Sequence, residues 1–555
     1  MSATPRRIVL AASTSESCEY RRSAYRQMLL ATLPAKYAHL IGVDWSSQVD
    51  VAADGQAVSV PHGLRVVEAL LLERIPPEDI AVCHPDQFDR FIGDETRVIG
   101  MHAHNPLGIA FAADIYSNLA GATAEPINAA EFRRLILHPT LRAHRHHMKI
   151  IVGGPGAWQI EKMGLQDEWG VDTLVHGEAE DAVGDLFDAA LRGEALPRRV
   201  ECNSPRLDRI PRIHHRSTFG AVEITRGCGR GCRFCSVALR DGKSFPLEHI
   251  IANVKTQVAE GADTILLVTE DVFLYEQGRL FDTNVSALKR LLDAVLSVAG
   301  VKYVSLTHGT MAPVLVNPTM VEELTPLAVG HSVYQHRAST HPDKRYQTLF
   351  IGLETGSPRL FAEHMKGKSY PFRPEQWPDV VLRGMEILNK NNWFPICTWI
   401  LGLPGETDDD TRRSLDLLHA LRSAKWFVVP TLFAPLDETS LARETGKRLV
   451  TMTDLQWEFF FTCWRYNLDF FHNDRRTHWS YNLGIPLYYY LLGRRLFGGG
   501  MKYPLFRLAH MPERFLRRRL YLDLDREAKL AAPAHVPIPE KRLRVVMPET
   551  EGLLL

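Results

Sequence analysis

Short apolar runs alternate with amphipathic stretches through the first third of the chain. Strand-like runs such as RIVLAA, DIAVCHP and MKIIVGGP are separated by helix-like stretches such as GLRVVEALLLER and DAVGDLFDAALRG. This alternation is typical of a parallel sheet with helices on both faces. We therefore predict a doubly wound, Rossmann-like α/β domain over residues 1–200.

A polar stretch containing proline separates this region from a second alternating one. The sequence ECNSPRLDRIPRIHHR predicts a linker over residues 201–218. Six strand candidates follow, with helical segments between them: AVEITRG, DTILLVTED, KYVSLTHG, TLFIGLETG, FPICTWILGLPGE and WFVVPTLFAP. They predict a partial (βα)6 barrel over residues 219–445.

The pattern changes again after residue 445. Residues 455–506 hold 16 aromatic side chains in 52 positions, against 9% for the whole chain. Residues 475–519 hold ten lysines or arginines and one acid, a net charge of +9. We expect a mainly helical C-terminal extension over residues 446–555. It could contact a membrane surface, stack on RNA or cap the barrel; the apolar run 487–492 favours the membrane over RNA.

Composition narrows the class of protein. The 65 basic and 65 acidic residues cancel, so no overall field steers the chain to nucleic acid, and we expect no DNA partner. The apolar run Ile8 to Ala12 is too short for a signal peptide, and Pro486 interrupts the stretch 483–492, which is too short to span a membrane. Eight cysteines in 555 residues exclude a disulfide framework and indicate a reducing cytoplasm.

Three of these cysteines lie within eight positions. Cys228, Cys232 and Cys235 stand in TRGCGRGCRFCS, directly after the strand candidate AVEIT. The interleaved glycines allow a tight loop in which three thiolates converge on one inorganic cluster, and three thiolates leave one iron of a cubane open to a small molecule. A structural zinc loop is the alternative, but it needs a nearby fourth ligand, and none of the following has a usual zinc spacing: Cys202, His214, His215 and His249.

This spacing resembles the signature of the radical S-adenosylmethionine superfamily, with Phe234 as the aromatic residue before the third cysteine. The resemblance implies a [4Fe–4S] cluster on the three cysteines, with S-adenosylmethionine chelating the fourth iron. One-electron reduction by a flavodoxin- or ferredoxin-type partner would then yield methionine and a 5′-deoxyadenosyl radical that abstracts hydrogen from an unactivated carbon.

Other barrel residues resemble binding motifs of the same superfamily. Thr269-Glu270-Asp271 follows the second strand where the family has glycine-glycine-glutamate, so the methionyl amine is assigned to Glu270, with Asp271 as a substitute. The remaining candidates for cofactor binding lie at the ends of the fourth and fifth strands: Glu354, Ser357, Ile400 and Gly402. The alternative for the carboxylates on these strands, Glu354 and Glu406, is that they stabilise the start of a helix.

The N-terminal region resembles the cobalamin-binding domain that precedes the barrel in one branch of the superfamily. VGGP supplies Gly153 and Gly154, and VHGE supplies Gly177 and Glu178, where glycine lets a backbone approach a flat cofactor. The cobalt-ligating D-x-H-x-x-G motif is absent, since residues 102–108 read HAHNPLG. We therefore expect cobalamin without a protein histidine on cobalt; the alternative is a domain that binds nothing. The histidine-rich run at 144–147 predicts a solvated turn.

A second resemblance, to the methylthiotransferases, is weaker. Those enzymes carry another three-cysteine cluster before the barrel and a small RNA-binding domain after it, whereas here the preceding cysteines are only Cys18, Cys83 and Cys202. The extension also lacks a short-strand pattern, so RNA is not the expected partner.

The function that these features predict is hydrogen abstraction from, and methylation of, a large apolar, lipid-like substrate, by a cytoplasmic enzyme peripheral to the inner face of the membrane. Radical cyclisation or carbon–carbon bond formation on a lipid or tetrapyrrole is the alternative reaction. An iron–sulfur electron carrier or redox sensor is the alternative of another class.

Overall fold

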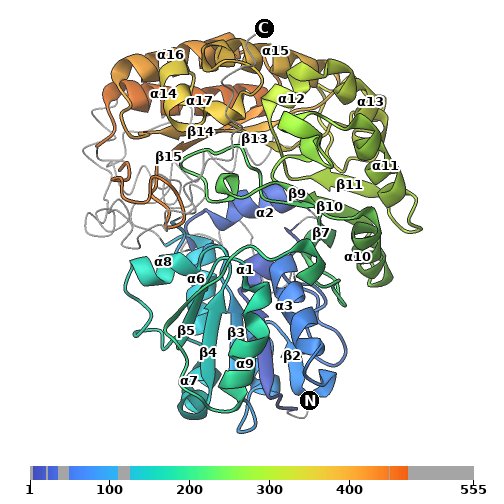
Figure 1. Cartoon of the computed structure of the whole chain (residues 1–555), viewed down its shortest axis with the longest axis vertical. Helices are drawn as coiled ribbons and strands as arrows, with labels where there is room; N and C mark the ends of the chain where they lie inside the picture. The colour runs from blue at the N-terminus through green and yellow to red at the C-terminus, as the bar shows by residue number, and fades with distance from the viewer. Residues whose placement is uncertain (1–3, 21–22, 36–48, 110–124, 449–450, 473–555) are drawn as a thin grey trace. The chain divides into compact units, whose positions relative to one another are not determined.

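The structure is a computed structural model of the chain. It describes residues 4–20, 23–35, 49–109, 125–448 and 451–472. The described residues form two compact units, one from the ranges 1–222 and 248–265 and one from the ranges 223–247 and 266–555 (Figure 1).

The first unit is built on a parallel sheet with the order β2-β1-β3-β4-β5-β6. Its strands are β1 (Ile8–Ala12), β2 (Ile80–Val82), β3 (Val98–His102), β4 (Lys149–Gly153), β5 (Thr173–His176) and β6 (Arg199–Glu201). Its helices are α1 (Thr14–Ser17), α2 (Ala24–Ala31), α3 (His62–Leu72), α4 (Phe88–Phe91), α6 (Ile127–Ile136), α7 (Pro139–His144), α8 (Ala157–Lys162) and α9 (Val183–Leu191).

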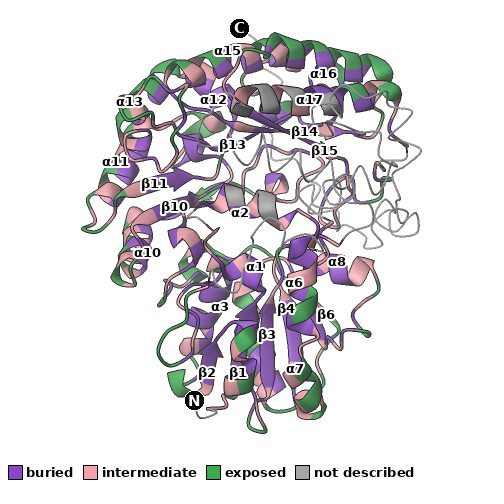
Figure 2. Ribbon diagram, turned by 180° about the vertical axis from the view of Figure 1, so that it is seen from behind, coloured by how far each residue is buried: buried purple, intermediate pink, exposed green. Residues whose placement is uncertain are grey.

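Successive residues of β1 enter two different cores, because side chains alternate across a sheet. Val9 and Ala11 pack with α4, α6, α7 and α8 on one face. Ile8 and Leu10 pack with α3 and α9 on the other. Both faces of the strands are therefore buried (Figure 2), which is why the sequence shows continuous apolar runs rather than alternation.

The order of the strands changes direction at β1. The chain goes from β1 to β2 on one side and then to β3 on the other. Doubly wound folds bind ligands at such a point, outside the carboxyl ends of the strands. The loops after β1 and β3 lie here, with those after β4 and β5 beside them along the same edge.

The second region contains the six strand candidates of the predicted barrel. They form β7 (Ala221–Glu223), β10 (Thr264–Val268), β11 (Tyr303–Leu306) with β12 (His308–Gly309), β13 (Phe350–Glu354), β14 (Ile396–Leu401) and β15 (Phe427–Leu432). The pairing runs β11-β10-β7 in one sheet and β12-β13-β14-β15 in the next, with only residue 307 between β11 and β12. A small antiparallel pair, β8 (Thr225–Arg226) and β9 (Lys243–Ser244), brackets the cysteine motif.

Helices alternate with these strands. They are α10 (Leu247–Ala259), α11 (Val285–Leu296), α12 (Met311–Val316), α13 (Pro318–Ala328), α14 (Pro358–His364), α15 (Trp377–Lys390) and α16 (Asp408–Ala420). Helices α13, α15 and α16 have exposed outer faces and buried inner faces (Figure 2), as expected of helices that cover a barrel.

Helix α17 (Asp454–His472) covers the edge strand β15. The side chain of Asn467 accepts from the N–H of Val428 and donates to its carbonyl, at 2.8 and 2.7 Å. These bonds occupy backbone groups that an edge strand would otherwise leave open. The start of the aromatic extension is thus a helical cap on the barrel, whereas the basic stretch 475–519 lies outside the described residues.

The predicted fold class is confirmed, with one physical difference in the predicted linker. That stretch begins on β6, which pairs with β5, and it buries Ile210 and Ile213. The N–H of Ile213 donates to the side chain of Asn253 at 3.1 Å. Residues 201–218 are therefore ordered by packing. No helix among the described residues is long and apolar enough to cross a membrane.

Candidate functional site

The cysteine motif forms a compact loop between β8 and η10 (Val237–Leu239), a short 3₁₀ turn. Glycines 227, 229 and 231 all have positive φ, of 79°, 74° and 69°, as a tight loop requires. The N–H of Cys228 donates to the carbonyl of Arg240 at 3.1 Å, and that of Gly231 to Ala238 at 2.9 Å. The loop is thus closed by its own backbone.

The three thiols converge and are largely shielded from water. Burial raises the pKa of Cys228 to about 11 and that of Cys232 to about 12, and it also raises the pKa of Cys235. The sulfur of Cys232 also interacts electrostatically with the other two, and none of the three is in a disulfide. Thiols held close together and protonated in this way fit iron, which binds thiolates and displaces their protons.

Arg230, inside the loop, anchors it to the barrel. Its guanidinium is 1% exposed and donates to the carbonyls of Gly367 and Lys368 at 3.2 and 3.3 Å, and to Asp271 at 3.4 Å. It also lies 4.6 Å from the ring centre of Phe281. A buried arginine with these partners fixes where the three sulfurs face.

The two adjacent acids after β10 have different surroundings. Asp271 is 4% exposed, and besides Arg230 it accepts from the hydroxyl of Thr310 at 2.5 Å and the N–H of Phe273 at 3.2 Å. The carboxylate of Glu270 accepts no hydrogen bond from the described part of the chain. Burial and the charge of Glu223 raise the pKa of Glu270 to about 7, and Glu270 in turn raises the pKa of Cys235. Glu270 is therefore the acid available to a ligand beside the thiols.

Glu354, at the end of β13, forms a buried ion pair that the sequence did not reveal. Lys368 Nζ donates to its Oε1 at 2.7 Å, and the Thr398 hydroxyl donates to its Oε2 at 3.2 Å. Burial alone would lower the pKa of Lys368, but Glu354 and the sulfurs of Cys232 and Cys235 raise it. The pair thus places a positive charge near the cluster loop, and Glu354 is not an exposed helix-start carboxylate.

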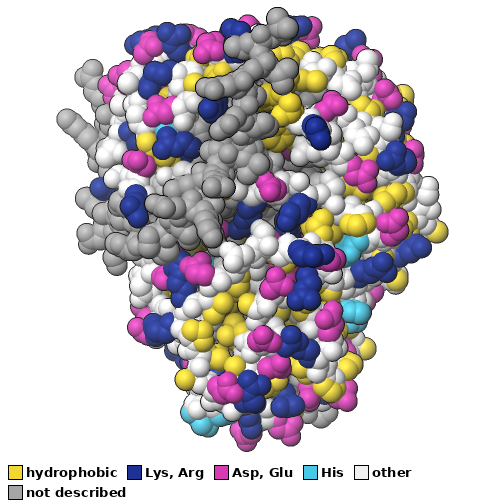
Figure 3. Space-filling model, in the orientation of Figure 1, with side chains coloured by type: hydrophobic (Ala, Val, Ile, Leu, Met, Phe, Trp, Pro, Cys, Tyr) yellow, Lys and Arg dark blue, Asp and Glu magenta, His cyan; other side chains and the backbone are white. Residues whose placement is uncertain are grey.

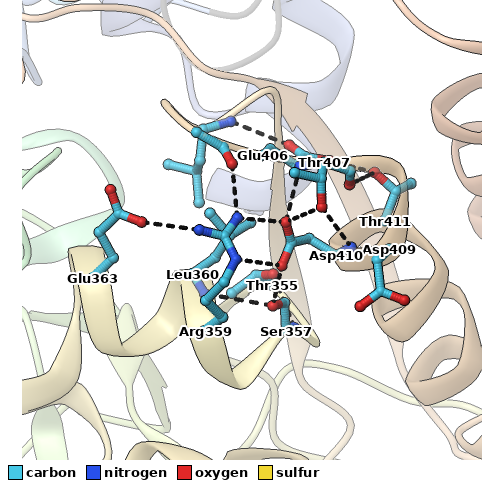
Figure 4. Close-up of polar contacts among 12 residues, drawn as sticks. Thr355, Ser357, Arg359, Leu360, Glu363, Glu406, Thr407, Asp409, Asp410 and Thr411 are labelled. Atoms are coloured by element: carbon cyan, nitrogen blue, oxygen red, sulfur yellow. Dashed lines mark hydrogen bonds and ion pairs between the residues drawn. The ribbon is translucent and has the colours of Figure 1, made fainter.

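Ser357 caps helix α14 (Figure 4). Its hydroxyl accepts from the N–H of Leu360 at 3.4 Å and donates to Asp410 at 2.5 Å. Arg359 and Thr407 also donate to Asp410, at 2.5 and 2.6 Å. Burial would raise the pKa of Asp410, but these bonds hold it well below its ordinary value. This network ties α14 to the start of α16 and gives Ser357 a structural role; that Ser357 also binds a cofactor stays a prediction.

The turn after β14 is closed by hydrogen bonds to the carboxylate of Glu406, a residue of the same turn. Glu406 accepts from the N–H groups of Gly402 and Leu403 and from the hydroxyl of Thr411. Gly402 has a φ of 79°, a backbone conformation that glycine adopts without the steric cost of a side chain. On the strand, Ile400 alternates with the buried Trp399 and Leu401, so it lies on the face that also carries Thr398 beside Glu354. Phe234 is half-buried in the cysteine loop.

Two of the predicted cofactor-binding glycines of the first unit, Gly154 and Gly177, lie directly against the backbone of a neighbouring strand end. A Cβ on Gly154, where φ is 106°, would lie 2.8 Å from the carbonyl oxygen of Ala103, and one on Gly177 would overlap that of Cys202. Gly153 sits in the extended end of β4 with ordinary contacts. The carboxylate of Glu178 accepts from the Ser204 hydroxyl at 2.9 Å. These residues let neighbouring strand ends approach closely at the edge where doubly wound folds bind ligands.

The loop after β3 is anchored by Glu16, a residue that the sequence pattern did not single out. Glu16, in α1, lies 2.8 Å from Nδ1 of His102 and accepts from the N–H of His104 at 3.1 Å. Further along, the side chain of Gln159 donates to Asn105 at 3.0 Å. Glu16 is far from His102 in the sequence, and only the fold brings the two together. The sequence feature that could have pointed to Glu16 is its position directly after the first strand.

Cys18, Cys83 and Cys202 do not form a second cysteine site. They are buried in three separate apolar clusters, and those of Cys83 and Cys202 lie on opposite faces of the sheet. The second cluster of a methylthiotransferase therefore has no counterpart among these residues.

The strands and the cysteine loop described above lie in a part of the chain that matches a known family. Residues 222–418 match the family model of the Radical SAM superfamily. The predicted domain type is confirmed, and so is the prediction of an enzyme over a binding module.

Curated relatives match about half of the chain at low identity. A probable threonylcarbamoyladenosine tRNA methylthiotransferase of Pyrococcus abyssi is 27% identical over 264 residues, covering 46% of this chain and 56% of the relative. A tRNA-2-methylthio-N(6)-dimethylallyladenosine synthase of Coxiella burnetii is 23% identical, covering 55% of this chain and 65% of the relative. The chain thus spans less than two thirds of these relatives. Because their names concern tRNA, the expectation that RNA is not a partner has no support from them.

A solved structure resembles more of the chain. The radical S-adenosylmethionine methyltransferase TsrM of Kitasatospora setae, with tryptophan and a S-adenosylmethionine analogue bound, matches with a TM-score of 0.50 and 14% identity. The match covers 78% of this chain and 75% of TsrM. A second TsrM structure, with a TM-score of 0.48, holds cobalamin and a [4Fe–4S] cluster. The likeness extends the shared fold beyond the barrel to the N-terminal sheet.

Proposed function

We propose that the protein is a cobalamin-dependent radical S-adenosylmethionine enzyme that methylates an unactivated carbon of a large apolar substrate. The observation that carries this proposal is the loop of three converging thiols beside the free carboxylate of Glu270. The loop would bind a metal cluster through its thiolates, and the carboxylate can accept a hydrogen bond from an ammonium or amine group of a ligand.

The donor set fits a [4Fe–4S] cluster with one open iron, since the loop offers Cys228, Cys232 and Cys235 and no fourth cysteine. Such a cluster, once reduced, would supply the electron that cleaves S-adenosylmethionine, and a flavodoxin- or ferredoxin-type protein would supply that electron in turn. Arg230 orients the loop through its bonds to the 367–368 carbonyls.

Glu270 and Lys368 provide opposite charges for the two ends of an amino acid. Glu270 would accept from the methionyl amine of S-adenosylmethionine, while Lys368, fixed by Glu354, presents an ammonium to its carboxylate. Asp271 is the weaker candidate for the amine because its oxygens already bind Arg230 and Thr310. Ile400 and Gly402 would contact the adenine side of the ligand.

Cobalamin is proposed for the carboxyl edge of the N-terminal sheet, near Gly153, Gly154, Gly177 and Glu178. It would supply a transferable methyl group. Support comes from the doubly wound topology and from the fold shared with TsrM, which has been solved with cobalamin bound.

The apolar substrate and the membrane surface are proposed from the extension of the chain. Its basic stretch would attract anionic headgroups by about 1 kcal/mol per basic residue near the surface, and its aromatic residues can bury in the interface. The enzyme would then work from the cytoplasm at the inner face of the membrane.

One experiment tests the cofactor and the substrate class together. Full-length protein with its cluster is mixed with hydroxocobalamin, passed through gel filtration and read by its visible spectrum; retained cobalamin is expected. Methyl-labelled S-adenosylmethionine is then supplied with a lipid extract or with tRNA, beside a Cys228→Ala control. Label in the lipid fraction supports the proposal, and label in tRNA replaces the substrate class. Loss of all cobalamin contradicts the methylation, and 5′-deoxyadenosine without label indicates cyclisation or coupling.

A further inference from the structure

Three side chains with metal-ligating atoms meet at the edge of the N-terminal sheet opposite the proposed cofactor edge. Helix α7 ends at His144 and continues into η6 (Arg145–His147), a 3₁₀ turn just before β4. Asp94 lies in the turn that precedes β3. Since β3 and β4 are adjacent and parallel, both turns arrive at the amino ends of their strands. Figure 3 shows histidine side chains, in cyan, gathered at this end of the unit.

The spacing of these groups suits a small cation. The ligand atoms of Asp94, His144 and His147 all lie within 4.8 Å of one another. Nδ1 of His144 and Oδ1 of Asp94 are 3.4 Å apart. Two ligands about 2.0–2.1 Å from a tetrahedral zinc ion are about 3.4 Å apart, so this pair is already at the required separation.

The third ligand has the second contact that metal-bound histidines usually have. Nε2 of His147 lies 3.3 Å from the carbonyl oxygen of Gly93, to which it can donate. That bond leaves the lone pair on Nδ1 of His147, which accepts from His146 in the absence of a metal. The Nε2 atom of His146 is 3.2 Å from this Nδ1, so a fourth nitrogen stands beside the group.

The turn that carries the histidines is held in place without a metal. Arg145, between them, donates to the carbonyl of Gly170 and to Asp172, both at 2.7 Å, and to the carbonyl of Met148 at 2.7 Å. The backbone of η6 is therefore fixed from the opposite side. A rigid turn lowers the conformational entropy that metal binding has to overcome.

We propose that Asp94, His144 and His147 bind one zinc ion, with His146 or water as the fourth ligand. Two or three imidazoles and one carboxylate are borderline donors that suit Zn²⁺ better than Mg²⁺ or Ca²⁺. The ion joins the turn before β3 to the turn before β4 and stabilises the sheet at the edge away from the proposed chemistry. The sequence predicted a solvated turn here because Asp94 is far from the histidines along the chain.

The test measures zinc on the full chain with its cluster in place. Wild type, His144→Ala/His147→Ala and the control His214→Ala/His215→Ala, which removes two exposed histidines elsewhere, are incubated with zinc and desalted. Zinc and iron are then counted by mass spectrometry, and affinity is measured by calorimetry. We expect one zinc per chain in wild type and control, and an affinity at least about 100-fold lower in the His144/His147 variant at unchanged iron.

A second variant keeps the test decisive if the double variant misfolds. Asp94→Asn removes one charged ligand from an exposed position and should weaken zinc about tenfold or more. Zinc should also raise the melting temperature of wild type but not of the variants. Equal zinc in all the proteins, or an equal loss in the His214/His215 control, would overturn the proposal.

Discussion

The strand ends of the barrel and those of the N-terminal sheet differ in the kinds of residue that pack there. In the barrel, buried charged side chains face one another: Arg230 with Asp271, and Lys368 with Glu354. Along the N-terminal sheet, glycines bring backbone against backbone, at Gly154 for instance. Both edges lie at the carboxyl ends of parallel strands, so the fold alone does not determine the difference.

The contrast reflects what each edge would bind. Burying charge is unfavourable unless each charge is paired, and the barrel meets this requirement with two ion pairs, one of which involves Arg230 of the cysteine loop. The N-terminal edge instead brings backbone against backbone, and its ionisable groups, such as Glu16 beside His102, lie around this surface. The barrel is therefore expected to be sensitive to single changes of charge, and the sheet to changes of volume.

The largest expected effect comes from the cysteine loop. Replacing Cys228, Cys232 or Cys235 by alanine should reduce iron from about four per chain to near zero, because a cubane needs all three thiolates. Iron analysis after anaerobic reconstitution measures this. Cys83→Ala, at a buried cysteine of the N-terminal sheet, is the matched control and should retain iron. Stoichiometric zinc in place of iron would refute the cluster.

The next effect concerns Asp271 and Arg230. Asp271→Asn leaves the buried guanidinium without its partner and should destabilise the protein by about 3–5 kcal/mol, seen as a lower melting temperature. Arg230→Met together with Asp271→Asn removes both charges and should recover part of the loss. A double variant that is worse than the sum of the single ones would show that the two side chains do not act as a pair.

Glu270 is expected to matter for the ligand more than for the fold. Glu270→Gln should weaken S-adenosylmethionine binding by about 10- to 100-fold, the loss expected for a hydrogen bond to a charged group, as measured by equilibrium dialysis. Glu276→Gln, at an exposed acid nearby, is the control. An unchanged affinity would move the amine site elsewhere.

The same carboxyl gives a pH dependence. Its pKa is raised from 4.5 to about 7 in the folded protein, so the native state binds the proton more tightly than the unfolded chain does. Without ligand, stability should fall as pH rises from about 4.5 to about 7, since the unfolded chain loses this proton over that range while the native carboxyl keeps it. Melting curves across this range should show a smaller slope for Glu270→Gln, and equal slopes would contradict the assignment.

The smallest effect is at the helix cap. Ser357→Ala removes the cap of α14 and one donor to Asp410, and should cost about 1 kcal/mol with ligand affinity unchanged. Ser297→Ala, at an exposed position near the end of α11, is the control for a hydroxyl outside this network. A loss of ligand affinity with normal stability would instead return Ser357 to the binding site.

Much of the fold could be predicted from the sequence. The apolar runs of both alternating regions became strands because parallel strands are buried on both faces and need such runs. The three cysteines were predictable too, since their spacing lies within one loop. Their placement needs no information from distant parts of the chain.

The charged partners could not be predicted in the same way. Lys368 follows α14 in a stretch without any periodic pattern, and only folding brings it to Glu354. Glu270 and Asp271 are chemically alike and adjacent, so the sequence could not tell which of them Arg230 would bind. Pairings of this kind depend on tertiary contacts between strand ends.

The most direct test is cleavage of S-adenosylmethionine by the full-length protein under strictly anaerobic conditions. Wild type with its cluster, reduced by dithionite, should form 5′-deoxyadenosine and methionine in equal amounts, and Cys235→Ala should form neither. A protein that holds about four irons, is reduced and reoxidised reversibly and yet produces no 5′-deoxyadenosine would be an electron carrier or redox sensor, and would contradict the account.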